Sequence, residues 1–255
     1  GWPQLTKELE TFHSTDIMVT GHDIISLWVS RMIMMTIKFT GEVPFEKVYI
    51  HGLVTDAAGQ KMSKSKGNGL DPMDIINGIS LDKLVAKRTN NLMQPKMAKR
   101  IDKATRKEYP DGILAYGTDA LRFTFYSIAT NTRTIRFDMK RVEGYRNFCN
   151  KLWNIARFAE NKLGDNFQPK APEPKTLADH WIIQELTTAK ASIEKAIDTY
   201  RLSEASDSLY HVVWDSVADW YIEASKDQDN LDLLAYSSRT FDRSESHSSW
   251  LRHDC

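Results

Sequence analysis

The chain has 255 residues, of which 41% are hydrophobic and 27% are charged, with 34 basic and 34 acidic side chains. This composition is typical of a folded globular protein and excludes an extended disordered chain. The two cysteines, Cys149 and Cys255, exclude a disulfide framework and favour a reducing compartment. A chain of this length predicts one large domain or two smaller ones.

The balanced net charge hides an uneven distribution along the chain. Residues 1–60 contain four basic and seven acidic side chains, residues 61–160 contain 20 and 10, and residues 161–255 contain 10 and 17. The middle block therefore carries a formal charge of +10. Such a local excess can attract a polyanion even to a neutral protein, although a solvated surface patch explains it equally well.

The first 60 residues predict a parallel βαβ unit. Short β-prone runs at residues 17–20 and 47–50 flank an apolar stretch, residues 24–39, which we expect to form a buried helix. That stretch is too short and too charged to cross a membrane, and no signal peptide precedes it. Each run is followed by a glycine, which lets the backbone approach a ligand at the sheet edge where open α/β folds bind their ligands.

A cationic segment follows this unit. Residues 61–65 read Lys-Met-Ser-Lys-Ser, and Lys66, Gly67 and Asn68 come next. Lysines and serines in this density predict a mobile loop that can fold over a triphosphate. The ammonium groups would neutralise charge that builds on a leaving pyrophosphate. On composition alone, a solvated lysine-rich turn is the simpler interpretation.

Residues 71–138 have a mixed pattern, with breakers at residues 71–72 and 109–112 and a helix N-cap expected at Thr118 and Asp119. After Asp138, apolar residues recur every three to five positions, which indicates a helical bundle. Three stripes carry this pattern: Tyr145, Phe148, Leu152, Ile155, Phe158 and Leu163; Trp181, Ile182, Leu186, Ala189, Ile193, Ile197 and Tyr200; and Leu209, Val212, Val213, Val217, Trp220, Tyr221 and Ala224.

The end of the chain differs from the predicted bundle. Residues 237–249 contain six serines, and such a segment cannot bury an apolar face. We expect residues 236–255 to be an atypical serine-rich tail, for which a reading-frame error or an artificially added end is one hypothesis. Because the chain begins with Gly1 rather than Met, we also expect a fragment of a longer protein.

The order of these features resembles a known family. Residues 61–65 match the KMSKS motif of class I aminoacyl-tRNA synthetases in all five letters, and residues 51–60 are similar to the segment that precedes that motif. Residues 21–35 and 138–154 resemble the valyl-tRNA synthetase family in particular. The resemblance extends from about residue 1 to residue 235.

The resemblance implies an α/β region followed by an all-α region. Residues 1–70 would form the second half of a Rossmann-like catalytic domain, with a parallel sheet and the KMSKS loop. Residues 71–138 would form a mixed junction that contacts the inner tRNA stem. Residues 139–235 would form an incomplete anticodon-binding domain, built as an antiparallel helical bundle.

Matching positions imply an ATP site. Asp23 would contact the ribose, although an aspartate after a strand can instead cap a helix. His51 would lie near the adenine, and Lys64 is the stronger candidate for stabilising the transition state. The ATP-binding candidates are Gly21, Asp23, His51, Gly52, Met62, Ser63 and Ser65, and the catalytic candidates are Lys61 and Lys64.

The resemblance also implies sites for valine and tRNA. Ile24 and Trp28 lie one helical turn apart, and in the valyl family these positions line the amino-acid pocket. Taken alone, Trp28 is more simply explained as core. The candidates for tRNA phosphate contacts are Arg133, Arg136, Lys140, Arg141, Arg146 and Lys151, of which the last two could equally belong to solvated helix faces.

The implied parent is a cytoplasmic, monomeric enzyme that uses ATP with Mg²⁺ to activate valine and transfers the valyl group to tRNA(Val). No protein-bound metal and no membrane partner are expected. Because the HIGH motif and the editing domain are missing from the sequence, we expect the isolated chain to be inactive. The alternatives are a non-catalytic tRNA-binding module and an isoleucine-type class I synthetase fragment, against which Trp28 and residues 138–154 argue.

Overall fold

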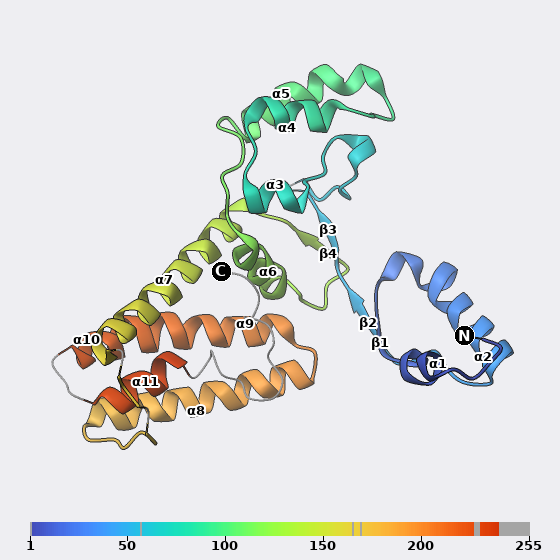
Figure 1. Ribbon diagram of the computed structural model, residues 1–255. Helices are drawn as coiled ribbons and strands as arrows, with labels where there is room; N and C mark the ends of the chain where they lie inside the picture. Colours follow the sequence, from blue (N-terminus) through green and yellow to red (C-terminus); the bar gives the residue numbers. More distant parts are fainter. Residues whose placement is uncertain (1, 57, 165, 169, 227–229, 240–255) are drawn as a thin grey trace. The chain divides into compact units, whose positions relative to one another are not determined.

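The structure is a computed structural model, and it describes residues 2–56, 58–164, 166–168, 170–226 and 230–239 (Figure 1). The chain divides into two compact units. The first is drawn from Gly1–Met62 and Ala129–Phe137, and the second from Ser63–Ile128 and Asp138–Cys255.

The first unit is built on a pair of parallel strands. Strand β1 (Thr15–Gly21) pairs with β2 (Phe45–His51), in a register that runs from Thr15 opposite Phe45 to Gly21 opposite His51 (Figure 1). The predicted parallel βαβ unit is therefore confirmed. A second parallel pair joins β3 (Leu53–Thr55) to β4 (Thr134–Arg136).

The connection between β1 and β2 is helical but not one regular α-helix. It consists of a 3₁₀ turn, η1 (His22–Ile24), a π-helical turn, η2 (Ile25–Val29), and α2 (Ser30–Thr40). Helix α2 ends at Gly41, whose φ of 79° and N–H donated to the Ile37 carbonyl form a left-handed C-cap. The short α1 (Lys7–Phe12) precedes β1 and is capped by the Thr6 hydroxyl.

The prediction that residues 24–39 form a buried helix is wrong at every position except Val29, which is 3% exposed. No residue of α2 is buried, and Met34 and Phe39 are 61% and 55% exposed. The physical reason is that the sheets in the described part of the first unit have only two strands each, which is too few to cover the apolar side chains of α2. No helix among the described residues is long and apolar enough to cross a membrane.

The second unit begins with short helices. A 3₁₀ turn, η3 (Lys64–Lys66), leads to α3 (Pro72–Asn77), α4 (Leu81–Thr89), η4 (Pro95–Met97), α5 (Ala98–Glu108) and α6 (Thr118–Ser127). Asp71 caps α3 through the Met73 N–H, and Pro72 takes the first helical position, as proline prefers. The expected cap of α6 is wrong, because Thr118 is already helical and Gly117, with φ of 86°, precedes it without a side-chain cap.

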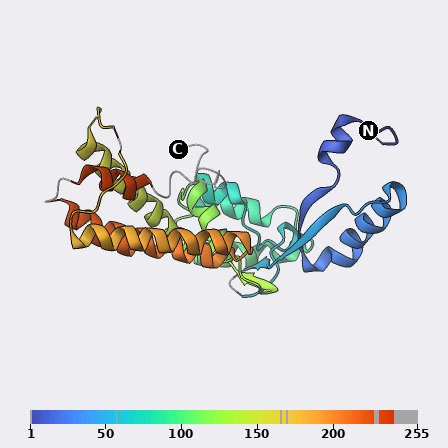
Figure 2. The same ribbon diagram turned by 90° about the horizontal axis from the view of Figure 1, so that it is seen from below.

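Long helices dominate the rest of the second unit. They are α7 (Met139–Leu163), α8 (Leu177–Asp198), α9 (Leu202–His211), the π-helical η5 (Val212–Tyr221), α10 (Ile222–Ser225) and α11 (Leu231–Arg239). Helices α8 and α9 pack against each other and lie side by side in Figure 1; in Figure 2, seen from below, they overlap. The predicted tail lies outside the described residues from 240 onward, whereas residues 236–239 complete α11.

The core of these helices follows the predicted stripes in most positions. The most completely buried large side chains of this cluster are Phe148, Ile182, Leu186, Val217, Tyr221, Leu233 and Leu234. The stripe assignment fails at Trp181, Tyr200 and Ala224, which are exposed, and most clearly at Trp220, which is 69% exposed. The period predicted for an α-helix misplaces the Trp220 side chain because the residue lies in the π-helical η5, whose turns are wider.

A buried carboxylate ties three of these elements together. Asp179 and Thr176 form a capping box at the start of α8, and Asn230 donates to Asp179 Oδ2 at 2.9 Å from the segment before α11. Burial acts to raise the pKa of Asp179, but bonds from the Lys175 N–H, the Asn230 amide and Thr176 together hold that pKa below its usual value. Burial and the Asp179 charge in turn raise the pKa of the Tyr221 phenol, which stays protonated.

We predict that Asp179→Asn destabilises the chain by about 1–3 kcal/mol at pH 7, because charge-assisted hydrogen bonds are lost in a buried site. A carboxyl with a lowered folded-state pKa stabilises fully above its unfolded pKa of about 3.9 and loses that contribution as pH falls through the folded value. The gap between wild type and variant in urea unfolding should therefore close below about pH 4. The exposed Asp198→Asn, at the other end of α8, is the control, with an effect within about 0.5 kcal/mol. A gap that stayed constant from pH 7 to pH 3 would contradict this role.

Candidate functional site

The carboxyl ends of β1 and β2 bring together two groups that are far apart in sequence. Asp23 lies two residues after the end of β1, in the turn η1, whereas Lys61 is positioned by an antiparallel bridge to Thr55 at the end of β3. The Lys61 ammonium donates to Asp23 Oδ2 at 2.7 Å. The two side chains are 62% and 34% exposed respectively, so this pair faces solvent at the sheet edge.

The hydrogen bond from Lys61 and its positive charge lower the pKa of the Asp23 carboxyl, which burial alone would raise slightly. Asp23 is therefore ionised at neutral pH. The alternative role as a helix cap is wrong, because Asp23 lies inside η1, whose N-cap position is taken by Gly21 without any side-chain cap bond. The ion pair is open to solvent, so either side chain can leave its partner and bind a ligand instead.

Gly21 and Gly52 at this edge leave space that neighbouring residues of the chain occupy. A Cβ at Gly21 would lie 2.8 Å from Asp23 Oδ1 and 2.9 Å from Leu53 Cδ2, so a side chain there would displace the Asp23 carboxylate. A Cβ at Gly52 would lie 2.6 Å from the Thr132 carbonyl oxygen. Beside them, the exposed His51 ring has its Nδ1 3.0 Å from the Gly52 carbonyl oxygen, which orients the imidazole.

The two candidates for an amino-acid pocket lie on an irregular turn. Ile24 ends the 3₁₀ turn η1, and Trp28 lies in the π-helical turn η2, so the α-helical spacing expected between them is not realised. Both side chains are exposed, Trp28 by 58%. Single π-helical turns occur frequently at functional sites, and here the irregular connection leaves both apolar side chains open to solvent.

The remainder of the cationic segment forms a defined turn in the second unit. The Ser63 N–H donates to Asn68 Oδ1 at 3.0 Å, and the Ser63 and Ser65 hydroxyls lie 2.7 Å apart. The Lys66 and Gly67 N–H groups donate to the carbonyls of Ser63 and Lys64. Lys64 and Lys66 are exposed on this turn, while Met62, at the junction of the units, is half-buried.

Gly67 anchors the turn to the helices behind it. Its φ is 68°, and a Cβ there would lie 2.6 Å from the Arg88 carbonyl oxygen and 2.8 Å from Ile101 Cδ1. The Arg88 guanidinium donates to the Gly67 carbonyl at 2.9 Å, and the Met93 N–H donates to the Ser65 carbonyl at 3.0 Å. Only glycine satisfies both the left-handed backbone and the close approach.

A charge cluster supports the chain after the turn. Lys87 Nζ contacts Asp71 Oδ2 at 2.8 Å and both Asp74 oxygens at 2.8 and 2.9 Å. The hydrogen bond from Lys87 is the main cause of a lowered Asp71 pKa, to which the nearby Lys64 charge contributes, and the two aspartates raise the pKa of Lys87. The cluster joins the start of α3 to α4.

The six predicted tRNA contacts fall into different environments. Arg133 and Arg136 are exposed at β4 in the first unit, and Lys140 and Arg141 are exposed at the start of α7. Arg146 is exposed on α7, and its guanidinium lies 6.0 Å from the centre of the Tyr116 ring. Lys151 differs, because it pairs with Asp219 at 2.8 Å and lies 5.2 Å from the Trp214 ring, which favours a packing role.

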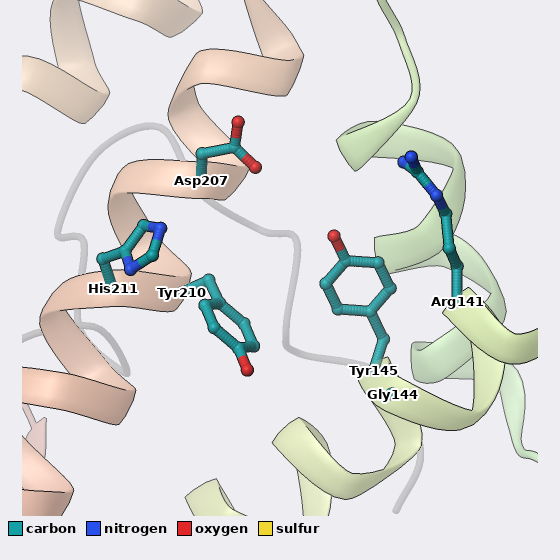
Figure 3. A pocket seen from close by; sticks show the side chains of 6 residues that line it. All are labelled: Arg141, Gly144, Tyr145, Asp207, Tyr210 and His211. Atoms are coloured by element: carbon teal, nitrogen blue, oxygen red, sulfur yellow. The ribbon is translucent and has the colours of Figure 1, made fainter.

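A surface pocket of about 310 Å³ lies between α7 and α9 (Figure 3). Arg141 is the one lining residue that the sequence predicts as functional: Tyr145 belongs to a predicted core stripe, Gly144 has no side chain to indicate a site, and Asp207, Tyr210 and His211 come from a separate helix. In Figure 3 the side chains of Tyr145 and Tyr210 point towards each other across the space between the helices; their rings are edge to face, with centroids 6.1 Å apart. The pocket is lined by Arg141, Gly144, Tyr145, Asp207, Tyr210 and His211. Within the described ranges, no group of three or more His, Cys, Asp or Glu side chains is placed to hold a metal ion.

Comparison with known proteins places these features in context. The model of the tRNA synthetases class I (I, L, M and V) matches residues 1–138, and the model of the anticodon-binding domain of tRNA ligase matches residues 179–241. The chain is 52% identical over 227 residues to the valine–tRNA ligase of Coxiella burnetii (strain RSA 493 / Nine Mile phase I), and 53% identical over 233 residues to that of Legionella pneumophila (strain Lens). Each alignment covers 89% of this chain and 25% of the relative, so the chain spans about a quarter of the length of these relatives.

A solved structure shows the same fold. The agnB2 LeuRS of Agrobacterium radiobacter K84, in a ternary complex with tRNA and LeuAMS, matches with a TM-score of 0.58 at 15% identity, covering 88% of this chain and 25% of that one. The likeness supports a class I synthetase-like arrangement of parallel strands and helices.

We predict that Gly67→Ala loosens the turn of Ser63–Asn68. Alanine adds the cost of a left-handed backbone, about 1 kcal/mol, and a clash with the Arg88 carbonyl that costs about 1–3 kcal/mol more. Gly41→Ala is the matched control, because Gly41 has a similar φ of 79° but nothing within 4 Å of its Cβ position. Hydrogen exchange of peptides that contain Gly67 and Met93 measures the effect. If the Gly67 and Met93 amides were equally protected from hydrogen exchange in Gly67→Ala and Gly41→Ala, packing around Gly67 would not be what holds the turn.

Proposed function

The chain belongs to the class I tRNA synthetase family, and from this premise we propose that it is the part of a valine–tRNA ligase that joins the nucleotide-binding half of the catalytic domain to the anticodon-binding domain. The named relatives at 52% and 53% identity support valine as the amino acid. Trp28 and residues 138–154 argue for valine over isoleucine, as their resemblance implies.

The observation that carries the proposal is the Lys61–Asp23 pair at the carboxyl edge of parallel strands, 2.7 Å apart and followed directly by the lysine turn. Ligands of open parallel sheets bind at this edge. In the proposed complex, the Asp23 carboxylate accepts from the ribose hydroxyls of ATP, and Lys61 releases it to contact the phosphates. His51, Gly52 and Met62 surround the adenine, and Gly21 keeps room for the carboxylate.

The proposed reaction has two steps. The valine carboxylate attacks the α-phosphate of ATP, so that a carboxyl–phosphate bond forms, the α–β phosphoanhydride breaks, and pyrophosphate leaves with the electron pair. The valyl group is then transferred from the adenylate to a hydroxyl of the terminal tRNA ribose, which releases AMP. Mg²⁺ enters with ATP as part of the substrate, held by its phosphates.

The protein's part in this chemistry is positioning and charge stabilisation. Lys64, with the Ser63 and Ser65 hydroxyls, would stabilise the charge that develops on pyrophosphate. The exposed Ile24 and Trp28 would form one wall of the valine site, where a broad indole leaves room for a short branched side chain. Their exposure in this chain accords with a pocket whose other wall comes from elsewhere in the parent protein.

The second unit would hold tRNA. We propose that residues 71–138 form the junction at the inner stem and that residues 139–235 form an antiparallel helical anticodon-binding domain. Arg133, Arg136, Lys140, Arg141 and Arg146 remain the proposed phosphate contacts, and Lys151 becomes the weakest of the six because of its pairing with Asp219. A monomeric, cytoplasmic parent is proposed from the family resemblance alone.

We predict that Lys64→Gln in the parent enzyme lowers kcat for valine-dependent ATP–pyrophosphate exchange by about 10²–10³, because a charge aimed at the transition state is lost. The KM for valine should stay unchanged. Lys66→Gln is the matched control, since Lys66 is exposed on the same turn but lies outside the motif. A Lys64→Gln enzyme with the kcat of wild type, or faster exchange with isoleucine than with valine, would contradict the proposal.

We further predict that the isolated 255-residue chain shows no valine-dependent exchange, because it spans a quarter of the relatives that carry this name. The measurement is the same exchange assay at equal molar concentration of chain and parent. Exchange by the chain at a rate near that of the parent would overturn the assignment of this region as an incomplete catalytic domain.

A further inference from the structure

One face of α5 and the turn before it carries a row of cations. The row, called the α5 stripe here, comprises Lys96, Lys99, Arg100, Lys103 and Lys107, which are all exposed. Their spacing of three, one, three and four residues places them within an arc of roughly 100° on a helix. The row extends over about 16 Å at 1.5 Å per residue.

The opposite face of α5 is occupied, so the stripe has a fixed direction. Thr105 is fully buried and accepts a hydrogen bond from the Arg88 guanidinium at 3.3 Å. Ile101 packs towards Gly67, where a Cβ would lie 2.8 Å from its Cδ1. Helix α5 lies against α4, as Figure 1 shows. The stripe therefore lies on the face of α5 opposite to the one that packs against the rest of the second unit.

The local acids are paired with cations outside the stripe. Asp102 and Asp82 both contact Arg106, at 2.7 and 3.3 Å, and Glu108 contacts Arg88 at 3.3 Å. Of the salt bridges formed among the described residues, none includes a stripe side chain. Repulsion between like charges three and four residues apart destabilises such a helix, so an external anion is the natural partner.

We propose that the α5 stripe is a docking surface for the phosphate backbone of double-helical RNA. A straight, rigid row of cations matches the regular line of phosphates along a duplex, and phosphate contacts need no base recognition. Single-stranded RNA is a poorer fit because its binding relies on aromatic platforms, and the exposed face of α5 carries no aromatic residue. This inference rests on the proposed tRNA partner and adds five residues outside the predicted contacts.

An anionic membrane is the competing partner for a basic helix. Such helices insert apolar side chains below the lipid headgroups. The apolar side chain of α5 that could do so, Ile101, is instead half-buried within the second unit. The charge pattern without a free apolar face therefore favours RNA.

The test compares the wild-type chain with two variants of equal charge. The stripe variant carries Lys99→Gln, Arg100→Gln and Lys103→Gln, and the control carries Lys7→Gln, Arg31→Gln and Lys38→Gln, at exposed positions on α1 and α2 of the first unit, outside the proposed tRNA-binding region. Glutamine is a good helix former, and circular dichroism checks that all three chains retain equal helicity. The probes are a valine-acceptor tRNA transcript, a plain RNA duplex, a single-stranded RNA and phosphatidylserine vesicles, each titrated over a salt series.

We expect the stripe variant to bind tRNA and the duplex at least tenfold more weakly at low salt. Its log–log salt slope should be smaller by about 2–3, at 0.7–0.9 for each lost phosphate contact. The control should follow wild type. A stripe variant that matches the control would overturn this inference while the tRNA partner stands, and wild type without any tRNA binding would overturn the proposed partner itself. Stripe-dependent binding to the vesicles or single strands in place of the duplex would assign the surface to that partner instead.

Discussion

The ion pair between Lys61 and Asp23 is the interaction on which the proposed site depends. Its two members come from positions 38 residues apart, and they meet because Asp23 lies in the turn after β1 while Lys61 is bridged to Thr55 at the end of β3. A carboxylate held ionised beside an exposed ammonium can accept from ribose hydroxyls while the ammonium turns to a phosphate. The pair thus keeps both groups poised at the sheet edge with little burial to oppose the exchange of partners.

The basic side chains of residues 61–160 differ in whether a carboxylate of the same chain pairs with them. Lys87, Arg88, Arg106 and Lys151 are paired with carboxylates, and they join helices to each other. Lys64 and the α5 stripe face solvent on elements whose other sides are anchored, through Gly67 and Thr105 respectively. Cations that pair with carboxylates and cations that we propose to bind phosphates therefore alternate along one stretch of sequence, and only the contacts in the structure distinguish them.

The two units also differ in how completely they bury their apolar side chains. In the second unit, Phe148, Leu186 and Tyr221 are enclosed by α7, α8 and η5. In the first, α2 and the π-helical turn before it leave Trp28, Met34 and Phe39 exposed. A parallel sheet is normally covered on both faces, and the described residues provide too few layers to do this.

The sequence by itself determined the elements and the family: periodicity predicted the parallel βαβ unit and the helices after Asp138, and residues 61–65 carried the resemblance that the comparisons confirm. These features are local, because they depend on spacing along the chain and on motif letters. Only the tertiary structure decided that Asp23 pairs with Lys61 rather than capping a helix, that Lys151 is engaged by Asp219, and that the helix after Asp23 is exposed. Each of these outcomes depends on which distant residue comes within a few ångströms, and no local pattern contains that information.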